Sequence, residues 1–182
     1  MVQACRAARR SLLAPDSSLV IGPQRSALHQ LTTAVAGTTD RSDLQAVLES
    51  AVAGLGVDAI GLSIISAPGL LRELSSTEPN VDGVDYAVDD FPATRHALDT
   101  GALVEAHVTD LDSDPAERRM LEDIGMASLL IVPLFAEERP LGILEFSHRV
   151  ERRWGADELT LARLLADHVA RAVARLGVVY FG

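Results

Sequence analysis

Apolar residues with helical spacing open the organised part of the chain. Between residues 28 and 37 they recur every three or four positions, which predicts an amphipathic helix. A second apolar stripe follows Asp40, which stands at the expected N-cap position, and it ends at Gly54 and Gly56. Each of these helices is expected to bury one face.

The next stretches alternate between strand and turn signals. Residues 57–65 are rich in β-branched and small apolar side chains and lead to Pro68, which predicts a strand and a turn, with residues 70–75 returning antiparallel. The clearest hairpin consists of the apolar stretches 128–135 and 141–147, joined by a charged turn.

The middle of the chain has weaker periodicity. Residues 78–90 hold several acids with a proline and a glycine, which indicates a loop with a short strand at 86–88. An alternative interpretation is that these acids bind a hard cation, but their spacing does not fit a known calcium loop. A solvated lid segment is therefore favoured. A short helix at 92–98 and a strand at 102–108 follow.

Two further helices complete the pattern. Asp112 or Ser113 is expected to cap a helix whose water-facing side carries Glu117. The last and longest helix begins at Gly155, and Glu158 supplies half of a capping box there.

The order of these elements is α-α-β-β-α-β-α-β-β-α, which predicts an α+β domain with three layers. We expect residues 23–177 to form this domain, residues 1–22 to form a flexible N-terminal tail and residues 178–182 to form a C-terminal tail.

Composition narrows the function classes. With 182 residues and 48% hydrophobic content, the chain suits a single domain. A net charge of -10 repels phosphate backbones, so we expect no direct binding to nucleic acid. No apolar run approaches about 20 residues, so no membrane span is expected. The single thiol, Cys5, cannot form an intramolecular disulfide and fits a reducing cytoplasm.

Particular motifs within this order resemble the GAF family of sensory domains over residues 25–176. The hairpin at 128–146 is similar to the family's paired central strands, and residues 97–101 are similar to its lid region. Residues 154–158 stand where the family often has an aromatic residue, a hydroxyl residue and an acid before its last helix. The resemblance implies a PAS-related fold with a central antiparallel sheet of about five or six strands. It places the N- and C-terminal helices on one face and short lid helices and loops on the other.

Three activities of the family require residues that the chain lacks. Members that bind cyclic nucleotides tend to carry a motif with asparagine and lysine, and this chain has no lysine. A covalently held bilin needs a thiol near the pocket, whereas Cys5 lies in the tail. A free methionine sulfoxide reductase needs a second thiol to resolve its sulfenic acid. We therefore expect no enzyme activity and no covalent bilin.

Other chemistry has little support in the sequence. No Gly-x-Ser-x-Gly nucleophile motif occurs. Five histidines raise haem, metal and catalytic alternatives, but structural or solvated roles are favoured for them, so neither haem nor a metal site is expected. The cofactor, if there is one, stays unknown.

The resemblance gives five candidate ligand-binding residues at the lid and the strand ends. They are Phe91, Arg95, His107, Arg118 and His148. The arginines lie on short helices over the expected pocket, where a guanidinium can form a bidentate pair with a carboxylate or a phosphate. Surface ion pairing is the alternative for the arginines, and a structural role is the alternative for the histidines.

Two main functional hypotheses follow, and a third is weaker. The first is a sensory domain that binds an unknown small molecule and signals through its terminal helices to a partner or an output domain. The second is a ligand-free dimerisation module of a larger regulator, since the first and last helices are expected to pair two copies into a homodimer. The third is an enzyme of the reductase type. An enclosed cavity with convergent polar groups favours the first.

Overall fold

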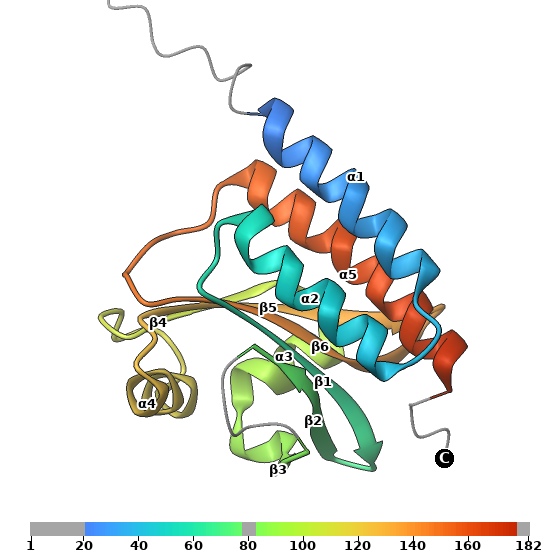
Figure 1. The fold of residues 1–182 in the computed structure, drawn as a ribbon. Helices are drawn as coiled ribbons and strands as arrows, with labels where there is room; N and C mark the ends of the chain where they lie inside the picture. The colour runs from blue at the N-terminus through green and yellow to red at the C-terminus, as the bar shows by residue number, and fades with distance from the viewer. Residues whose placement is uncertain (1–20, 78–82, 178–182) are drawn as a thin grey trace, which may run out of the picture.

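The computed structural model describes residues 21–77 and 83–177. A six-stranded antiparallel sheet in the order β3-β2-β1-β6-β5-β4 forms the middle layer (Figure 1). The strands are β1 (Ala59–Ala67), β2 (Leu70–Ser76), β3 (Asp85–Ala87), β4 (Val104–His107), β5 (Ser128–Ala136) and β6 (Arg139–His148).

Helices form the two outer layers. One face of the sheet carries α1 (Ile21–Gly37), α2 (Arg41–Leu55) and α5 (Ala156–Leu176), and the other carries the lid, which consists of a 3-10 turn η1 (Val88–Asp90), α3 (Pro92–Thr100) and α4 (Pro115–Ile124) (Figure 1). This arrangement confirms the predicted three-layer α+β architecture with its terminal helices on one side.

Local signals in the sequence set most of these boundaries. Asp40 caps α2 by accepting a hydrogen bond from the backbone N–H of Asp43, and α2 ends at Gly56 in a left-handed conformation. At the start of α5, the Glu158 carboxylate accepts from the Gly155 N–H over 2.8 Å, as the half capping box predicts. The predicted hairpin is present as β5 and β6.

Three boundaries differ from the sequence-based expectation. Helix α4 is capped by Asp114 rather than by Asp112 or Ser113, because Asp114 directly precedes Pro115 and its carboxylate reaches two free N–H groups of the first turn. Strand β4 spans only residues 104–107, since it pairs with β5 over four positions at the sheet edge. Ile21 and Gly22 belong to α1. The rest of the predicted N-terminal tail, the predicted C-terminal tail and Cys5 lie outside the described residues.

Strand alternation divides the interior into two cores. The pair Val132 and Leu144 faces the layer of α1, α2 and α5, whereas the neighbouring pair Ile131 and Glu145 faces the lid. The core under the helical layer is closely filled by apolar side chains. The core under the lid is smaller, and a cavity lies beside it.

One glycine allows the centre of the sheet to form. A Cβ at Gly142 of β6 would lie 2.0 Å from the Ser63 carbonyl oxygen and 2.8 Å from the Ile64 Cα of β1. Only a residue without a side chain permits this approach of the two strands.

A hydrogen bond joins the two outer layers. The Arg163 guanidinium of α5 donates to the carbonyl oxygen of Gly101, the C-cap residue of α3, over 2.9 Å. The lid and the last helix are therefore in direct contact.

Candidate functional site

A cavity of about 280 Å³ lies between the sheet and the lid. Its floor comes from β1, β2, β5 and β6, and its walls come from β3, α3 and α4. Apolar side chains make up much of the lining, and they include Val84, Phe91, Met120, Ile124 and Leu129. This volume lies just below the range for ligand pockets, which starts at about 300 Å³.

Three glutamates bring carboxyl groups to this cavity. Glu73 of β2 accepts a hydrogen bond of 2.7 Å from the Ser63 hydroxyl, and it is buried. Glu117 of α4 is 1% exposed and accepts a hydrogen bond of 2.7 Å from the Thr94 hydroxyl of α3. Glu145 of β6 is partly buried and also lines the cavity. The carboxyls come from three separate elements, so the fold itself assembles them.

Gly61 of β1 leaves room for two of these carboxyls. A Cβ at this position would lie 3.3 Å from Oε1 of Glu73 and 3.4 Å from Oε2 of Glu145. Both carboxyls therefore lie over the bare backbone of Gly61, on the floor of the cavity.

Burial and mutual repulsion shift the titration of this cluster. Burial raises the pKa of Glu145 well above its ordinary value, and repulsion from Glu73 and Glu117 adds to the effect. Burial also raises the pKa of Glu117, against the opposing hydrogen bond from Thr94. The cavity thus retains protons at pH values where exposed glutamates are ionised.

A tyrosine hydroxyl completes the polar lining. Burial raises the pKa of Tyr86 well above its ordinary value, and the nearby Glu145 charge raises it further. Its ring contacts that of Phe91 edge to face, with 5.4 Å between ring centroids. Of the five residues predicted to bind a ligand, Phe91 lines this cavity.

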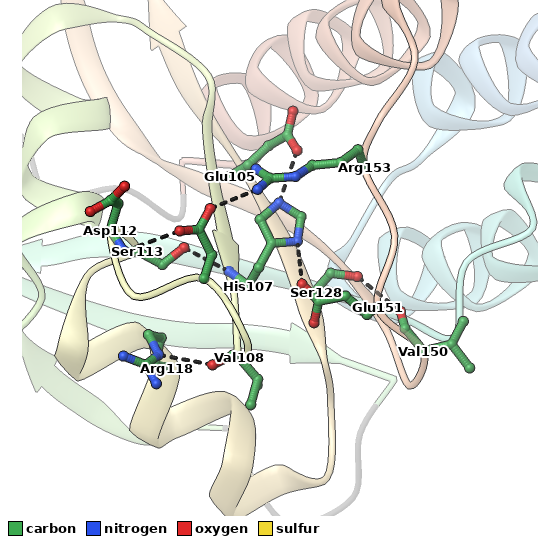
Figure 2. A network of polar contacts seen from close by, with 11 residues as sticks. Glu105, His107, Val108, Asp112, Ser113, Arg118, Ser128, Val150, Glu151 and Arg153 are labelled. Atoms are coloured by element: carbon green, nitrogen blue, oxygen red, sulfur yellow. Dashed lines mark hydrogen bonds and ion pairs between the residues drawn. The ribbon is translucent and has the colours of Figure 1, made fainter.

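The two predicted arginines lie elsewhere in the lid. Arg95 forms an exposed ion pair with Asp89. Arg118 donates from Nε to the Val108 carbonyl oxygen over 3.0 Å, which fastens α4 to the end of β4 (Figure 2). Among the described residues that line the cavity, none is basic.

His107 lies on the opposite face of the sheet from the cavity. It pairs with Ser128, on the side of the sheet that carries α5, and its side chain is 1% exposed. Its Nε2 lies 3.1 Å from Oε2 of Glu105, and its Nδ1 lies 3.4 Å from Oε1 of Glu151 (Figure 2). This position joins β4 to the segment that leads into α5, which is a structural role.

Asp110 and Arg153 extend this network. The Arg153 guanidinium lies 2.6 Å from Oδ2 of Asp110, which links the loop after β4 to the residues before α5. The attraction raises the pKa of Arg153 and lowers that of Asp110.

His148 also faces the helical layer. Its ring packs against Trp154 with 5.0 Å between centroids, and its Nδ1 lies 3.4 Å from Oδ2 of Asp58. Burial and the Arg152 charge lower its pKa, which favours the neutral ring. His148 is therefore packed against the core and does not reach the cavity.

The residues that sequence reasoning missed are the glutamates. Glu117 was expected on the water-facing side of its helix, and this prediction is wrong because that side of α4 covers the cavity. Glu145 could have been identified from the sequence, because it is an acid in an apolar strand. It lies on the same face of the strand as Ile143 and on the opposite face from His148. Between Ile143 and His148, the odd-numbered residues of β6 therefore face the side of the cavity, and the even-numbered residues face the helical layer.

Sequence and structure comparisons agree with this architecture. The family model described as GAF domain matches residues 42–173, and the chain belongs to the GAF family. No curated protein gives a significant match.

The solved structures that resemble the chain include GAF domains of phytochromes. The phycocyanobilin-bound GAF domain of a cyanobacterial phytochrome has a TM-score of 0.70 at 20% identity, over 85% of this chain and 96% of that one. A phycoerythrobilin-bound GAF domain from a cyanobacterial phytochrome has a TM-score of 0.69 at 20% identity with the same coverage. The chromophore-binding domain of the R. palustris bacteriophytochrome RpBphP3 has a TM-score of 0.68 at 14% identity, over 90% of this chain and 64% of that one. At these identities the likeness establishes the fold.

Two further features of the described residues concern their helices and their metal-ligating side chains. None of their helices combines the length and the apolar character that crossing a bilayer requires. No group of three or more histidine, cysteine, aspartate and glutamate side chains among them is arranged to hold a metal ion.

Proposed function

We propose that this GAF domain is a non-catalytic sensor that binds one small molecule in the cavity between the sheet and the lid. The observation that carries the proposal is a space of about 280 Å³ on which carboxyl, hydroxyl and apolar groups from several elements converge. A pocket filled by its own side chains would instead have favoured a purely structural module. Phe91, Glu117 and Glu145 are the proposed ligand contacts.

The elements around the cavity provide a route for the signal. Glu145 and Ser147 line the cavity from β6, and the same strand leads through residues 149–155 into α5. A ligand that orders the lid and shifts β6 changes the position of α5, because the binding energy selects one arrangement of these elements. We propose that a cytoplasmic partner or an attached output domain reads this change at α1 and α5.

Filling the cavity tests the proposal. Gly61→Val places a branched side chain against the two floor carboxyls, at a strand position where valine is otherwise favourable. Gly37→Val is the matched control, because a Cβ at Gly37 meets nothing within 4 Å. Each protein is incubated with a metabolite extract of its own host and measured by native mass spectrometry.

We expect a small-molecule adduct on the wild-type protein and on Gly37→Val, and its loss from Gly61→Val. Circular dichroism checks that Gly61→Val is folded. A folded Gly61→Val protein that keeps the adduct, or a wild-type protein that acquires none, contradicts a sensory role for this cavity.

A further inference from the structure

The charge of the cavity selects among classes of ligand. Glu73, Glu117 and Glu145 line it, and no arginine, lysine or histidine stands among the described lining residues. A phosphate or carboxylate ligand would add a negative charge beside these carboxyls with no cation to offset it. The cavity therefore disfavours anions.

Glu145 differs from the other two carboxyls, because no group among the described residues stabilises its ionised form. Burial and repulsion from Glu73 and Glu117 act on it, and no hydrogen bond or ion pair within the described residues offsets them. By contrast, Glu73 has the Ser63 hydroxyl and Glu117 has the Thr94 hydroxyl. A ligand that brings donors or positive charge to Glu145 supplies what this position lacks.

The walls define the rest of the ligand. Opposite the floor carboxyls stand the apolar side chains of Phe91, Met120 and Ile124, and these favour an apolar body. The Tyr86 and Phe91 rings also offer aromatic surface, to which cations are attracted. The volume of about 280 Å³ restricts the ligand to a compact molecule.

A metal ion fits this arrangement less well than an organic cation. A hard cation needs about six oxygen ligands converging within about 2.6 Å. The side chains in the described part of the chain form no such group. The carboxyls are instead spread between the floor and the lid, so they do not converge on one point.

We propose that the cavity takes a compact primary amine with an apolar body, whose ammonium group pairs with Glu145 and Glu73 over Gly61. This inference rests on the proposed sensory function and names its class of ligand. The bound ammonium stabilises the ionised form of Glu145, so a carboxyl that was protonated in the empty cavity releases its proton to solvent. Amine binding consequently tightens as the pH rises through the titration of Glu145.

Three probes of similar size and different charge test this class. They are 2-phenylethylamine, 2-phenylethanol and phenylacetate, each titrated into the full chain by isothermal titration calorimetry. We expect the amine to bind at least about tenfold more tightly than the alcohol, and phenylacetate to bind most weakly. Repeating the amine titration in buffers with different heats of ionisation measures the released proton.

Glu145→Gln is the variant that isolates the charge, because glutamine keeps the shape of the carboxyl and cannot ionise. It should lower amine affinity at least about tenfold, leave the alcohol unchanged and abolish proton release. Glu138→Gln, at an exposed glutamate of the hairpin turn, is the matched control and should behave as the wild-type protein does. Circular dichroism confirms folding of both variants.

The outcomes separate this inference from the proposed function. Failure of the amine to bind, or equal affinity for all three probes, overturns the amine class. An adduct in the metabolite experiment that proves to be neutral or anionic overturns it as well, while the sensory function stands. Loss of every adduct from the wild-type protein removes both.

Discussion

The carboxyl of Glu145 makes the stability of the domain depend on pH. Its folded-state pKa lies well above the ordinary value of 4.5, so the folded chain holds a proton that the unfolded chain has released between these two values. The stabilisation is complete below about 4.5 and is lost as the pH rises through the folded pKa. The raised pKa of Glu117 acts in the same direction.

We expect the unfolding free energy that Glu145 contributes to fall as the pH rises from the ordinary carboxyl range through the raised pKa of Glu145. Urea denaturation at a series of pH values measures it. Glu145→Gln should flatten the decline, whereas Glu138→Gln should keep the wild-type slope. A wild-type slope in Glu145→Gln would show that other groups set the pH dependence.

Gly142 is a second single position with a large predicted effect. Gly142→Ala places a methyl group 2.0 Å from the Ser63 carbonyl oxygen, so β1 and β6 have to move apart. We expect a loss of at least about 3 kcal/mol in unfolding free energy, or failure to fold, measured by thermal and urea denaturation. Gly37→Ala, at a position where a Cβ meets nothing, should cost less than about 0.5 kcal/mol.

At the residue scale, the sequence predicted the pocket only in part. Phe91 was found because the resemblance placed the lid, but the histidines were chosen by their closeness to strand ends without regard to the face they occupy. His107 and His148 both lie on the same side of their strands as the side chains that point toward the helical layer. Glu145 and Glu73 required knowledge of strand pairing, since only the sheet brings them together over Gly61.

Helices α3 and α4 depend on one shared cap. The Asp114 carboxylate accepts from Ala116 N–H over 2.7 Å, and its second oxygen accepts from Ala93 N–H of α3 over 2.9 Å. One side chain therefore begins α4 and ties it to the other lid helix.

Asp114→Ala should lower the unfolding free energy by about 1–2 kcal/mol and speed amide hydrogen exchange in the lid. Mass spectrometry of exchanged peptides measures the local effect. Asp112→Ala is the control, because Asp112 is exposed and does not cap α4. An equal effect of the two substitutions would contradict the assignment of the cap.

At the element scale, the sequence was more informative. The hairpin, the cap at Asp40 and the start of α5 were predicted because their signals are local, a few residues apart in the chain. The cap of α4 was displaced because three acids alternate there, and their distances to the free N–H groups decide among them. Register and bulges, such as those between β1 and β2, depend on tertiary packing and have no local signal.

The whole molecule presents two faces with different expected roles. The cavity lies under the lid, whereas α1 and α5 lie side by side in the layer beyond the opposite face of the sheet (Figure 1). On α5, Leu164 is 42% exposed, which suits a contact with a second copy.

We propose a homodimer through α1 and α5, and expect Leu164→Glu to shift the chain toward the monomer by at least about tenfold in dissociation constant, since it puts a charge into an apolar contact. Sedimentation velocity over a concentration series measures this change. Leu111→Glu, at a residue 81% exposed in the loop before α4, is the matched control and should leave association unchanged. A monomeric wild-type chain, or equal effects of both substitutions, would contradict dimerisation through these helices.

The hydrogen bond from Arg163 to Gly101 connects α5 directly to the lid, without passing through the sheet. The Arg163 guanidinium is hydrogen-bonded to the C-cap residue of α3. A rotation of α3 therefore either displaces α5 or breaks this hydrogen bond. A ligand bound beneath the lid, as proposed above, would then act on α5 through this one side chain, without any movement of the strands.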